Sequence, residues 1–206
     1  MTEHELVSRL VDALRELPDV HADVVHGELL GGRSDRGLDA AVDLHVAGKT
    51  LSVLVEAKRT VYPRDVRQVI WQIRDACRAW ARNHPGEAVS LIAAESISPG
   101  AKELLRSEGV GYYDSGGSLY LPAPGIYLYI DKPPPKTLVK SIRSLFSGRR
   151  AQVLHALLVH RQTWFGVTEL AQLAQVSPAT TSQVLTQLER FDWLEAKGQG
   201  PSKERH

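Results

Sequence analysis

The fold is decided by the stretch from Gly37 to Arg59, which reads GLDAAVDLHVAGKTLSVLVEAKR. Apolar residues alternate with other residues on both sides of Gly48-Lys49, and this is the period of a β-strand. Glycine at the first central position favours a two-residue hairpin turn, because it accepts a positive φ without a Cβ clash. The stretch therefore predicts two antiparallel strands joined at Gly48-Lys49, with Ala47 opposite Thr50.

That register sorts the side chains onto two faces, since successive residues of a strand point to opposite sides. It places Lys58 opposite Asp39, and Glu56 opposite Ala41. The apolar face is expected to carry Leu38, Ala40, Val42, Leu44, Val46, Leu51, Val53, Val55 and Ala57. The other face is expected to carry Asp39, Ala41, Asp43, His45, Ser52, Leu54, Glu56 and Lys58.

Asp39, Glu56 and Lys58 gather at one end of the second face. Two carboxylates at cross-strand distance, with a carbonyl or waters, suit a Mg²⁺ ion. The Lys58 ammonium beside such an ion would orient a water or stabilise charge on a phosphate. Asp43 is the alternative first carboxylate, but it lies two residues farther from Lys58. The alternative is that these residues have no catalytic role and belong to an antiparallel strand pair whose solvent side is charged.

An Asp, a hairpin turn and Glu-x-Lys in an apolar strand resemble the PD-(D/E)xK nuclease superfamily. The resemblance implies that Asp39 and Glu56 hold the metal and that Lys58 joins them as a catalytic residue. Magnesium is then the expected cofactor if the nuclease site is active, and no cofactor is expected otherwise. Leu38 departs from the family pattern, which often has Pro before the first Asp.

The rest of the first 130 residues alternates helices and strands. The resulting order predicts an α/β sandwich with a mixed sheet and flanking helices, which matches the restriction-endonuclease-like core. A loop over 31–37 brings Arg33 and Arg36 just before the candidate site, either as a solvated turn or as phosphate contacts. We expect helices over 2–17 (with a Thr2–Glu5 capping box), 63–83 and 99–107, and strands over 20–30, 88–94, 110–113, 118–121 and 126–130.

Length and composition describe an ordinary globular chain of one or two domains, with 206 residues, 43% of them hydrophobic and 24% charged. The apolar runs are too short to span a bilayer, and the N-terminus lacks the features of a signal peptide. A single cysteine, Cys77, excludes an internal disulfide framework and a thiolate zinc site. We therefore expect a cytoplasmic protein without a membrane partner.

The formal net charge of +1 hides an asymmetry. Residues 1–135 contain 15 Lys and Arg against 19 Asp and Glu, a net charge of −4. Residues 136–206 contain 10 against 5, a net charge of +5. A basic C-terminal part indicates an anionic partner, for which nucleic acid is the obvious candidate.

The C-terminal part changes to compact helices. We place the nuclease-like domain at 1–130, a proline-rich basic linker at 131–147 and a helical domain at 148–206. There the run ELAQLAQVSPATTSQVLTQLERFDWLEAKGQGPSKER predicts a helix, a turn, a second helix capped at Ser177-Pro178, and two short strands around a Gly-rich tip. A further short strand is expected over 163–167. The end at His206 fits either a minimal wing or a shortened one.

This run resembles the winged helix-turn-helix of bacterial transcription regulators. The resemblance places the second helix in the major groove, where Gln and Arg read base edges and Thr contacts methyls or phosphates. Cations of the wing and of the preceding helix would contact phosphates. The predicted DNA-binding residues are Arg149, Arg150, Ala179, Gln183, Thr186, Arg190, Lys197, Lys203 and Arg205.

Together, VEAKR, GYYDSGGSLYL and the winged helix resemble a bacterial group usually described as DNA-binding regulators, often near antitoxins of abortive-infection type IV toxin–antitoxin systems. Three functions stay open: a regulator bound to double-stranded DNA, a Mg²⁺-dependent endonuclease delivered by the winged helix, and a protein-interaction module without DNA binding. A homodimer and a partner protein encoded nearby are also open. The residues assign no role to GYYDSGGSLYL, in which Asp114 is expected at most to cap a turn.

Overall fold

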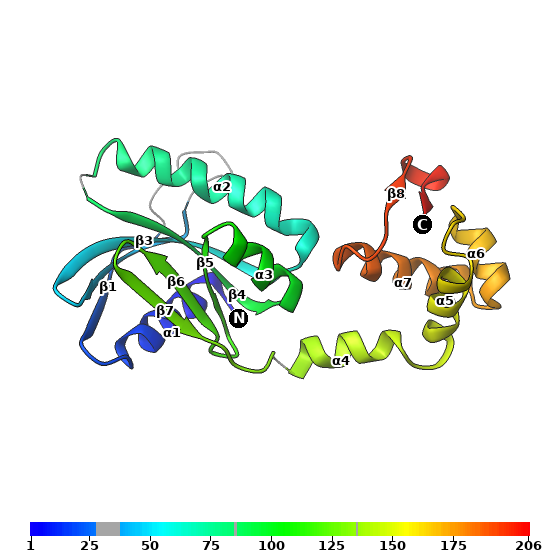
Figure 1. Ribbon diagram of the computed structural model, residues 1–206, viewed down its shortest axis with the longest axis horizontal. Coiled ribbons are helices and arrows are strands. Elements are labelled where there is room, and N and C mark those ends of the chain that lie inside the picture. The colour runs from blue at the N-terminus through cyan, green and yellow to red at the C-terminus, as the bar shows by residue number, and fades with distance from the viewer. Residues whose placement is uncertain (28–37, 85, 135) are drawn as a thin grey trace. The chain divides into compact units, whose positions relative to one another are not determined.

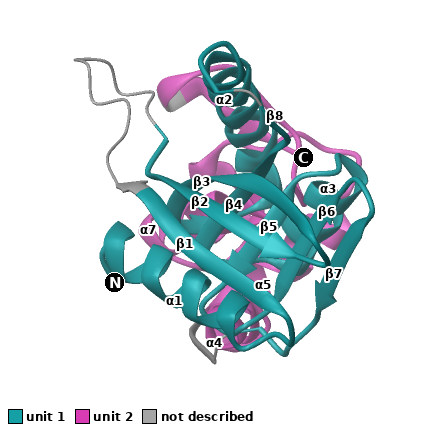
Figure 2. Ribbon diagram, turned by 90° about the vertical axis from the view of Figure 1, so that its left-hand side faces the viewer, with its two compact units in different colours: residues 1–135 teal, residues 136–206 magenta. Residues whose placement is uncertain are grey.

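The computed structural model describes residues 1–27, 38–84, 86–134 and 136–206. The chain divides into two compact units, residues 1–135 and 136–206, coloured teal and magenta in Figure 2. The loop predicted over 31–37, with Arg33 and Arg36, lies outside the described residues, as does the end of the strand predicted over 20–30. Among the described residues, no helix is long and apolar enough to cross a membrane.

The first unit is built on one seven-stranded sheet whose strands follow one another in chain order. The pairs β3–β4 and β4–β5 are parallel, and the other neighbours are antiparallel. The predicted α/β fold with a mixed sheet is therefore confirmed. The strands are β1 (Val20–Gly27), β2 (Ala40–Val46), β3 (Lys49–Val61), β4 (Ala88–Ile97), β5 (Gly111–Asp114), β6 (Leu119–Ala123) and β7 (Ile126–Ile130).

Helices cover both faces of this sheet (Figure 1). Helix α1 (Glu3–Arg15) packs on one face, and α2 (Pro63–Ala81) with α3 (Pro99–Ser107) packs on the other. Each helix turns an apolar stripe inward, as its spacing predicts. The Thr2–Glu5 capping box starts α1, as predicted. The buried stripe of α2 is Val66, Val69, Ile70, Ile73 and Trp80.

The hairpin turn lies one residue earlier than predicted, at Ala47-Gly48 rather than at Gly48-Lys49. Both central residues have a positive φ, 50° for Ala47 and 73° for Gly48, and Val46 pairs with Lys49. This is the pattern of a type I′ turn, whose twist matches that of the flanking strands. The predicted turn position is therefore wrong.

The new turn moves the pairing of β2 with β3 by two residues. Ala40 pairs with Val55, and the same register continued by one pair puts Asp39 opposite Glu56, not opposite Lys58 as predicted. A shift of two residues keeps each side chain on its face, so alternation alone does not distinguish the two registers. For the same reason, the three candidate side chains still share one face.

Two further parts of the face assignment are corrected. Leu38 precedes β2 and packs with Ala41 and Leu54 instead of with the apolar face, because strand alternation begins only at Ala40. The face of Asp39 is also not a solvent face, since Ala41 and Leu54 are fully buried in the cluster that includes α2. Both faces of the hairpin therefore contribute to the core.

The second unit is a helix-turn-helix with a small wing. Ser177 caps α7, and Gln175 ends α6 in the left-handed conformation, with φ of 53°. The strands β8 and β9 pair around a Gly-rich tip, as predicted. The elements are α4 (Lys136–Leu145), α5 (Gly148–Val159), α6 (Val167–Ala174), α7 (Pro178–Arg190), β8 (Ala196–Lys197), a 3₁₀ turn over Gly200–Ser202, and β9 (Glu204–Arg205).

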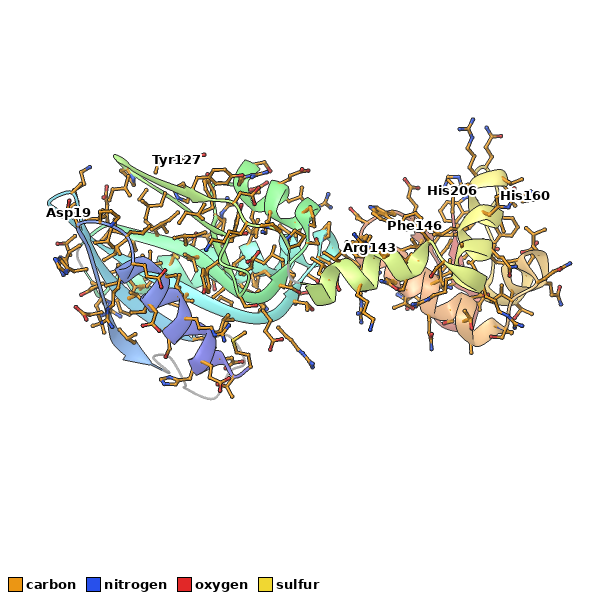
Figure 3. All side chains as sticks on the ribbon, turned by 90° about the horizontal axis from the view of Figure 1, so that it is seen from below. Asp19, Tyr127, Arg143, Phe146, His160 and His206 are labelled. Carbon is orange, nitrogen blue, oxygen red and sulfur yellow. The ribbon has the colours of Figure 1, made fainter. Side chains whose placement is uncertain are left out.

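Two assignments in this unit are corrected. Most of the segment expected as linker, 131–147, is helix α4, which belongs to the second unit. The Gln187 amide of α7 donates hydrogen bonds to Ser141 of α4, at 2.7 Å to its hydroxyl and 3.1 Å to its carbonyl. Figure 3 shows Arg143 and Phe146 projecting from the same segment. The strand expected over 163–167 is a single bridge, between Phe165 and Arg205.

The segment GYYDSGGSLYL contains a buried ion pair. The Lys102 ammonium of α3 lies 2.6 Å from Asp114 Oδ2 and 2.7 Å from the Ser118 hydroxyl. The Ser118 backbone N–H donates to Asp114 Oδ1, and the backbone N–H of Lys132 donates to the Ser118 hydroxyl. Asp114 is thus more than a turn cap, because its carboxylate joins α3 to β5 and β6.

Candidate functional site

The structure brings Asp39, Glu56 and Lys58 together beside the carboxyl end of β3. Asp39 directly precedes β2, whereas Glu56 and Lys58 lie on β3, the strand between β2 and β4. The backbone N–H of Ala57 donates to Asp39 Oδ2 at 2.6 Å, and Lys58 Nζ pairs with Glu56 Oε1. The carboxyl ends of parallel strands are a common place for ligand sites in α/β folds.

The surroundings of Asp39 in this cluster shift the pKa of its carboxyl group. Burial raises the pKa of Asp39, the nearby Glu56 carboxylate raises it further, and the Ala57 N–H and the Lys58 ammonium oppose both effects. Two half-buried carboxylates therefore repel each other at this point. A bound cation would offset both the loss of hydration and this repulsion.

The residues present fit a hard cation bound through oxygen. Asp39 and Glu56 supply two carboxylates, as Mg²⁺ sites commonly use together with waters and phosphates. Among the described residues, no group of three or more His, Cys, Asp and Glu side chains could hold a metal. Waters, backbone oxygens or a phosphate would therefore complete the coordination of an ion held by Asp39 and Glu56.

Two other acidic residues of this unit, Asp43 and Glu5, have local partners. The Ser52 hydroxyl donates to Asp43 Oδ1 at 3.0 Å, four pairs along the hairpin from Asp39. Glu5 accepts from the backbone N–H of Thr2 in the capping box of α1. These contacts favour Asp39 over Asp43 as the first carboxylate of the cluster.

In the second unit, α7 exposes the side predicted to contact DNA. Its core side is buried at Thr181, Val184, Leu185 and Leu188. Glu189, the one acidic residue of α7, is only 6% exposed, so the outer side carries no carboxylate. The exposed residues on the outer side include Ala179, Gln183, Thr186 and Arg190.

Glu189 forms ion pairs with two of the wing cations that were predicted to contact DNA. Lys203 Nζ lies 2.7 Å from Glu189 Oε2, and Arg205 Nε lies 2.8 Å from Glu189 Oε1. The side chains of Lys203 and Arg205 are 22% and 11% exposed. These cations fasten the wing to α7, so they are poorly placed to act as free phosphate ligands.

The other cations predicted to contact DNA differ in their exposure and in the partners that they already have. Lys197 pairs with Glu204 at 2.9 Å and lies over the Trp164 ring, but it stays exposed. Arg150 is half-buried and donates to Ser144 Oγ and Gln187 Oε1, which braces α4 against α7. Arg149 is exposed on the first turn of α5. Lys197, Arg149 and Arg190 are therefore the cations most available to an anionic partner.

Glu189 and Lys102 are two buried charged residues that were not among the residues predicted from the sequence. Glu189 follows Leu185 by four residues, so it falls on the core side of its helix, where a glutamate signals a buried partner. Lys102 lies beside Ala101 and three residues before Leu105, both of which are buried in α3. The helical period therefore marks both residues as buried charges, although it does not identify their partners.

The fold defines the class: an α/β unit with a mixed sheet, followed by a winged helix-turn-helix unit, as the sequence predicted. Residues 148–198 of the second unit match the model of the IclR helix-turn-helix domain.

Two solved structures are also similar to the chain. A repair endonuclease from Pyrococcus abyssi is 16% identical, with a TM-score of 0.35 over 55% of this chain and 47% of its own. EndoMS in its apo form is 16% identical, with a TM-score of 0.36 over 60% of this chain and 48% of its own. The chain thus spans about half the length of both structures. No curated protein matches it.

Proposed function

We propose that the chain is a sequence-specific regulator that binds double-stranded DNA through its winged helix-turn-helix. The observation that carries this proposal is the outer side of α7, where Gln183, Thr186 and Arg190 are exposed and the one acidic residue of the helix is turned inward. Such a side chain set suits the major groove, where Gln pairs with adenine and Arg with guanine.

The charge of the second unit supports this function. Residues 136–206 carry a formal net charge of +5, which attracts the phosphate backbone independently of sequence. Arg149 on α5 and Lys197 on β8 are exposed in the same unit. The resemblance through VEAKR and GYYDSGGSLYL favours an antitoxin-like regulatory role within this function, with a partner protein encoded nearby.

Replacement of Gln183 by Ala is expected to reduce the preference for the best duplex over a random one by about 5- to 100-fold, the effect of losing one good base contact. Binding to the random duplex should stay nearly constant, because phosphates dominate it. The preferred duplex would first be selected from a random pool, and both affinities would then be measured by fluorescence anisotropy.

The matched control is Gln152→Ala, which removes an exposed glutamine from α5 instead of from the outer side of α7. It is expected to leave the preference unchanged. Equal preference in the wild type and Gln183→Ala would contradict the proposed role of α7. Protein capture without any duplex binding would instead favour the protein-interaction module.

A second candidate function is Mg²⁺-dependent cleavage of DNA. The observation in its favour is the convergence of Asp39, Glu56 and Lys58 on one half-buried face. A bound Mg²⁺ would supply Lewis-acid activation of water and of the phosphodiester. Asp39 and Glu56 would hold the ion, and Lys58 would orient the attacking water or stabilise charge on the phosphate.

Cleavage of supercoiled plasmid with Mg²⁺ or Mn²⁺ tests this second function. Lys58→Ala and Asp39→Ala are each expected to slow nicking by about 100-fold or more, as loss of a group acting on a proton or charge in the transition state does. Asp43→Ala is the matched control and should nick at the wild-type rate. Nicking that survives Lys58→Ala, or no nicking by the wild type, would exclude this site as a nuclease centre.

A further inference from the structure

Helix α2 carries a second concentration of positive charge, on the side opposite its buried stripe. The basic positions recur at intervals of three, seven and four residues, so they lie along one outer face. Trp71 lies on the same face, with its side chain 55% exposed. The stripe consists of the exposed residues Arg64, Arg67, Arg74, Arg78 and, at the C-cap, Arg82.

This stripe stands out because the unit that carries it is acidic. Residues 1–135 have a net charge of −4, yet five of their 15 Lys and Arg residues lie on this one face. Arg74 Nη2 lies 3.1 Å from Glu108 Oε2, and Arg78 Nη1 lies 3.8 Å from Asp75 Oδ1. Both ion pairs are largely exposed, so their carboxylates compete only weakly with an anionic partner.

The stability of the helix does not account for this arrangement. Arg64 and Arg67 lie near the N-terminus of α2, where the helix dipole disfavours cations. Arg78 lies four residues from both Arg74 and Arg82, and like charges at that spacing destabilise a helix. At these positions the stripe does not stabilise the isolated helix, and an anionic partner would offset the repulsion among its cations.

We propose that the outer face of α2 is a sequence-independent contact surface for the phosphate backbone of duplex DNA, separate from the surface of α7. The stripe runs over 18 helical steps from Arg64 to Arg82, about 27 Å at the helical rise, and so can follow a run of phosphates. Guanidinium groups match phosphate oxygens in planar pairs, which favours Arg over Lys in this role.

The place of α2 in the fold agrees with this partner. It packs on one face of the sheet (Figure 1), and Leu54, two residues before Glu56 on β3, is buried in the same cluster as its apolar stripe. Strand alternation places Asp39, Glu56 and Lys58 on that face. DNA held along α2 would therefore lie on the side of the unit where the candidate nuclease cluster is found. The inference rests on the proposed DNA-binding function, but it gives the first unit a binding role of its own.

The test uses the full chain and a fluorescent duplex of random sequence, with the binding constant measured over a range of salt concentrations. Arg67→Ala/Arg82→Ala is expected to reduce the slope of log K against log salt by about 1.8, since each lost phosphate contact removes about 0.9. Arg67→Lys/Arg82→Lys should keep most of the slope, because it keeps both charges. Circular dichroism would establish that the variants are folded.

Arg9→Ala is the control, because Arg9 is exposed on α1, which packs on the opposite face of the sheet. It should leave the slope unchanged. A wild-type slope in Arg67→Ala/Arg82→Ala, with preference for the selected duplex intact, overturns the inference and leaves the proposed function standing. The inference is also overturned if Arg67→Ala/Arg82→Ala loses binding to single-stranded RNA but keeps its binding to duplex DNA. Absence of any duplex binding by the wild type rejects both.

Discussion

Replacement of Lys102 by Met is expected to lower the free energy of unfolding of the first unit by about 3–5 kcal/mol, the usual cost of leaving a buried charge without its partner. The side chains of Lys102 and Asp114 are 8% and 0% exposed. Methionine keeps much of the lysine stem but removes the ammonium that lies between Asp114 and Ser118. The Asp114 carboxylate would keep only the hydrogen bond from the Ser118 backbone.

Urea unfolding followed by the fluorescence of Trp71 and Trp80 and by circular dichroism measures this loss. The control Lys49→Met removes an exposed lysine whose ammonium donates to the Pro124 carbonyl, and it should cost less than about 1 kcal/mol. The double variant Lys102→Met/Asp114→Leu should recover part of the loss, because it removes both charges. A cost below about 1 kcal/mol for Lys102→Met would contradict the assigned role of the pair.

Replacement of Glu189 by Ala is expected to destabilise the second unit by about 2–4 kcal/mol, somewhat less than for a fully buried pair because Lys203 is partly exposed. The change leaves Lys203 and Arg205 next to each other without their shared carboxylate. It also frees the wing, since these two pairs join β9 and the residue before it to α7.

The matched control for this variant is Glu204→Ala. Glu204 pairs with Lys197, but their side chains are 42% and 54% exposed, so the loss should stay below about 1 kcal/mol. Urea unfolding followed by the fluorescence of Trp164 and Trp193 would measure both variants. Equal stability of the two variants would show that Glu189 does not hold the wing.

The sequence predicted the elements whose signals are local. One such signal specifies each of four helices, and these helices are found where expected. The signals are the capping box at Thr2, the Ser-Pro N-caps at Ser98 and Ser177, and the apolar stripe of α2. The shared face of Asp39, Glu56 and Lys58 was also predictable, because alternation along the hairpin decides it.

The register, the face of Leu38 and the partners of the buried charges were not predictable in the same way. Two hairpin registers that differ by two residues have identical faces, and only the turn at Ala47-Gly48 selects between them. Lys203 and Arg205 look like free wing cations in the sequence, and only the fold shows that Glu189 binds them. Helix α4 was not predicted because the prolines before it and its own cations suggested a linker.

The central claim is that the chain binds double-stranded DNA through the outer side of α7. Its most direct test is the affinity of the wild-type protein for duplex DNA at several salt concentrations, with the preferred and a random duplex side by side. We expect log K to fall linearly with log salt for both duplexes, with the preferred one bound more tightly throughout. No binding at low salt, or binding that salt does not weaken, would contradict the claim.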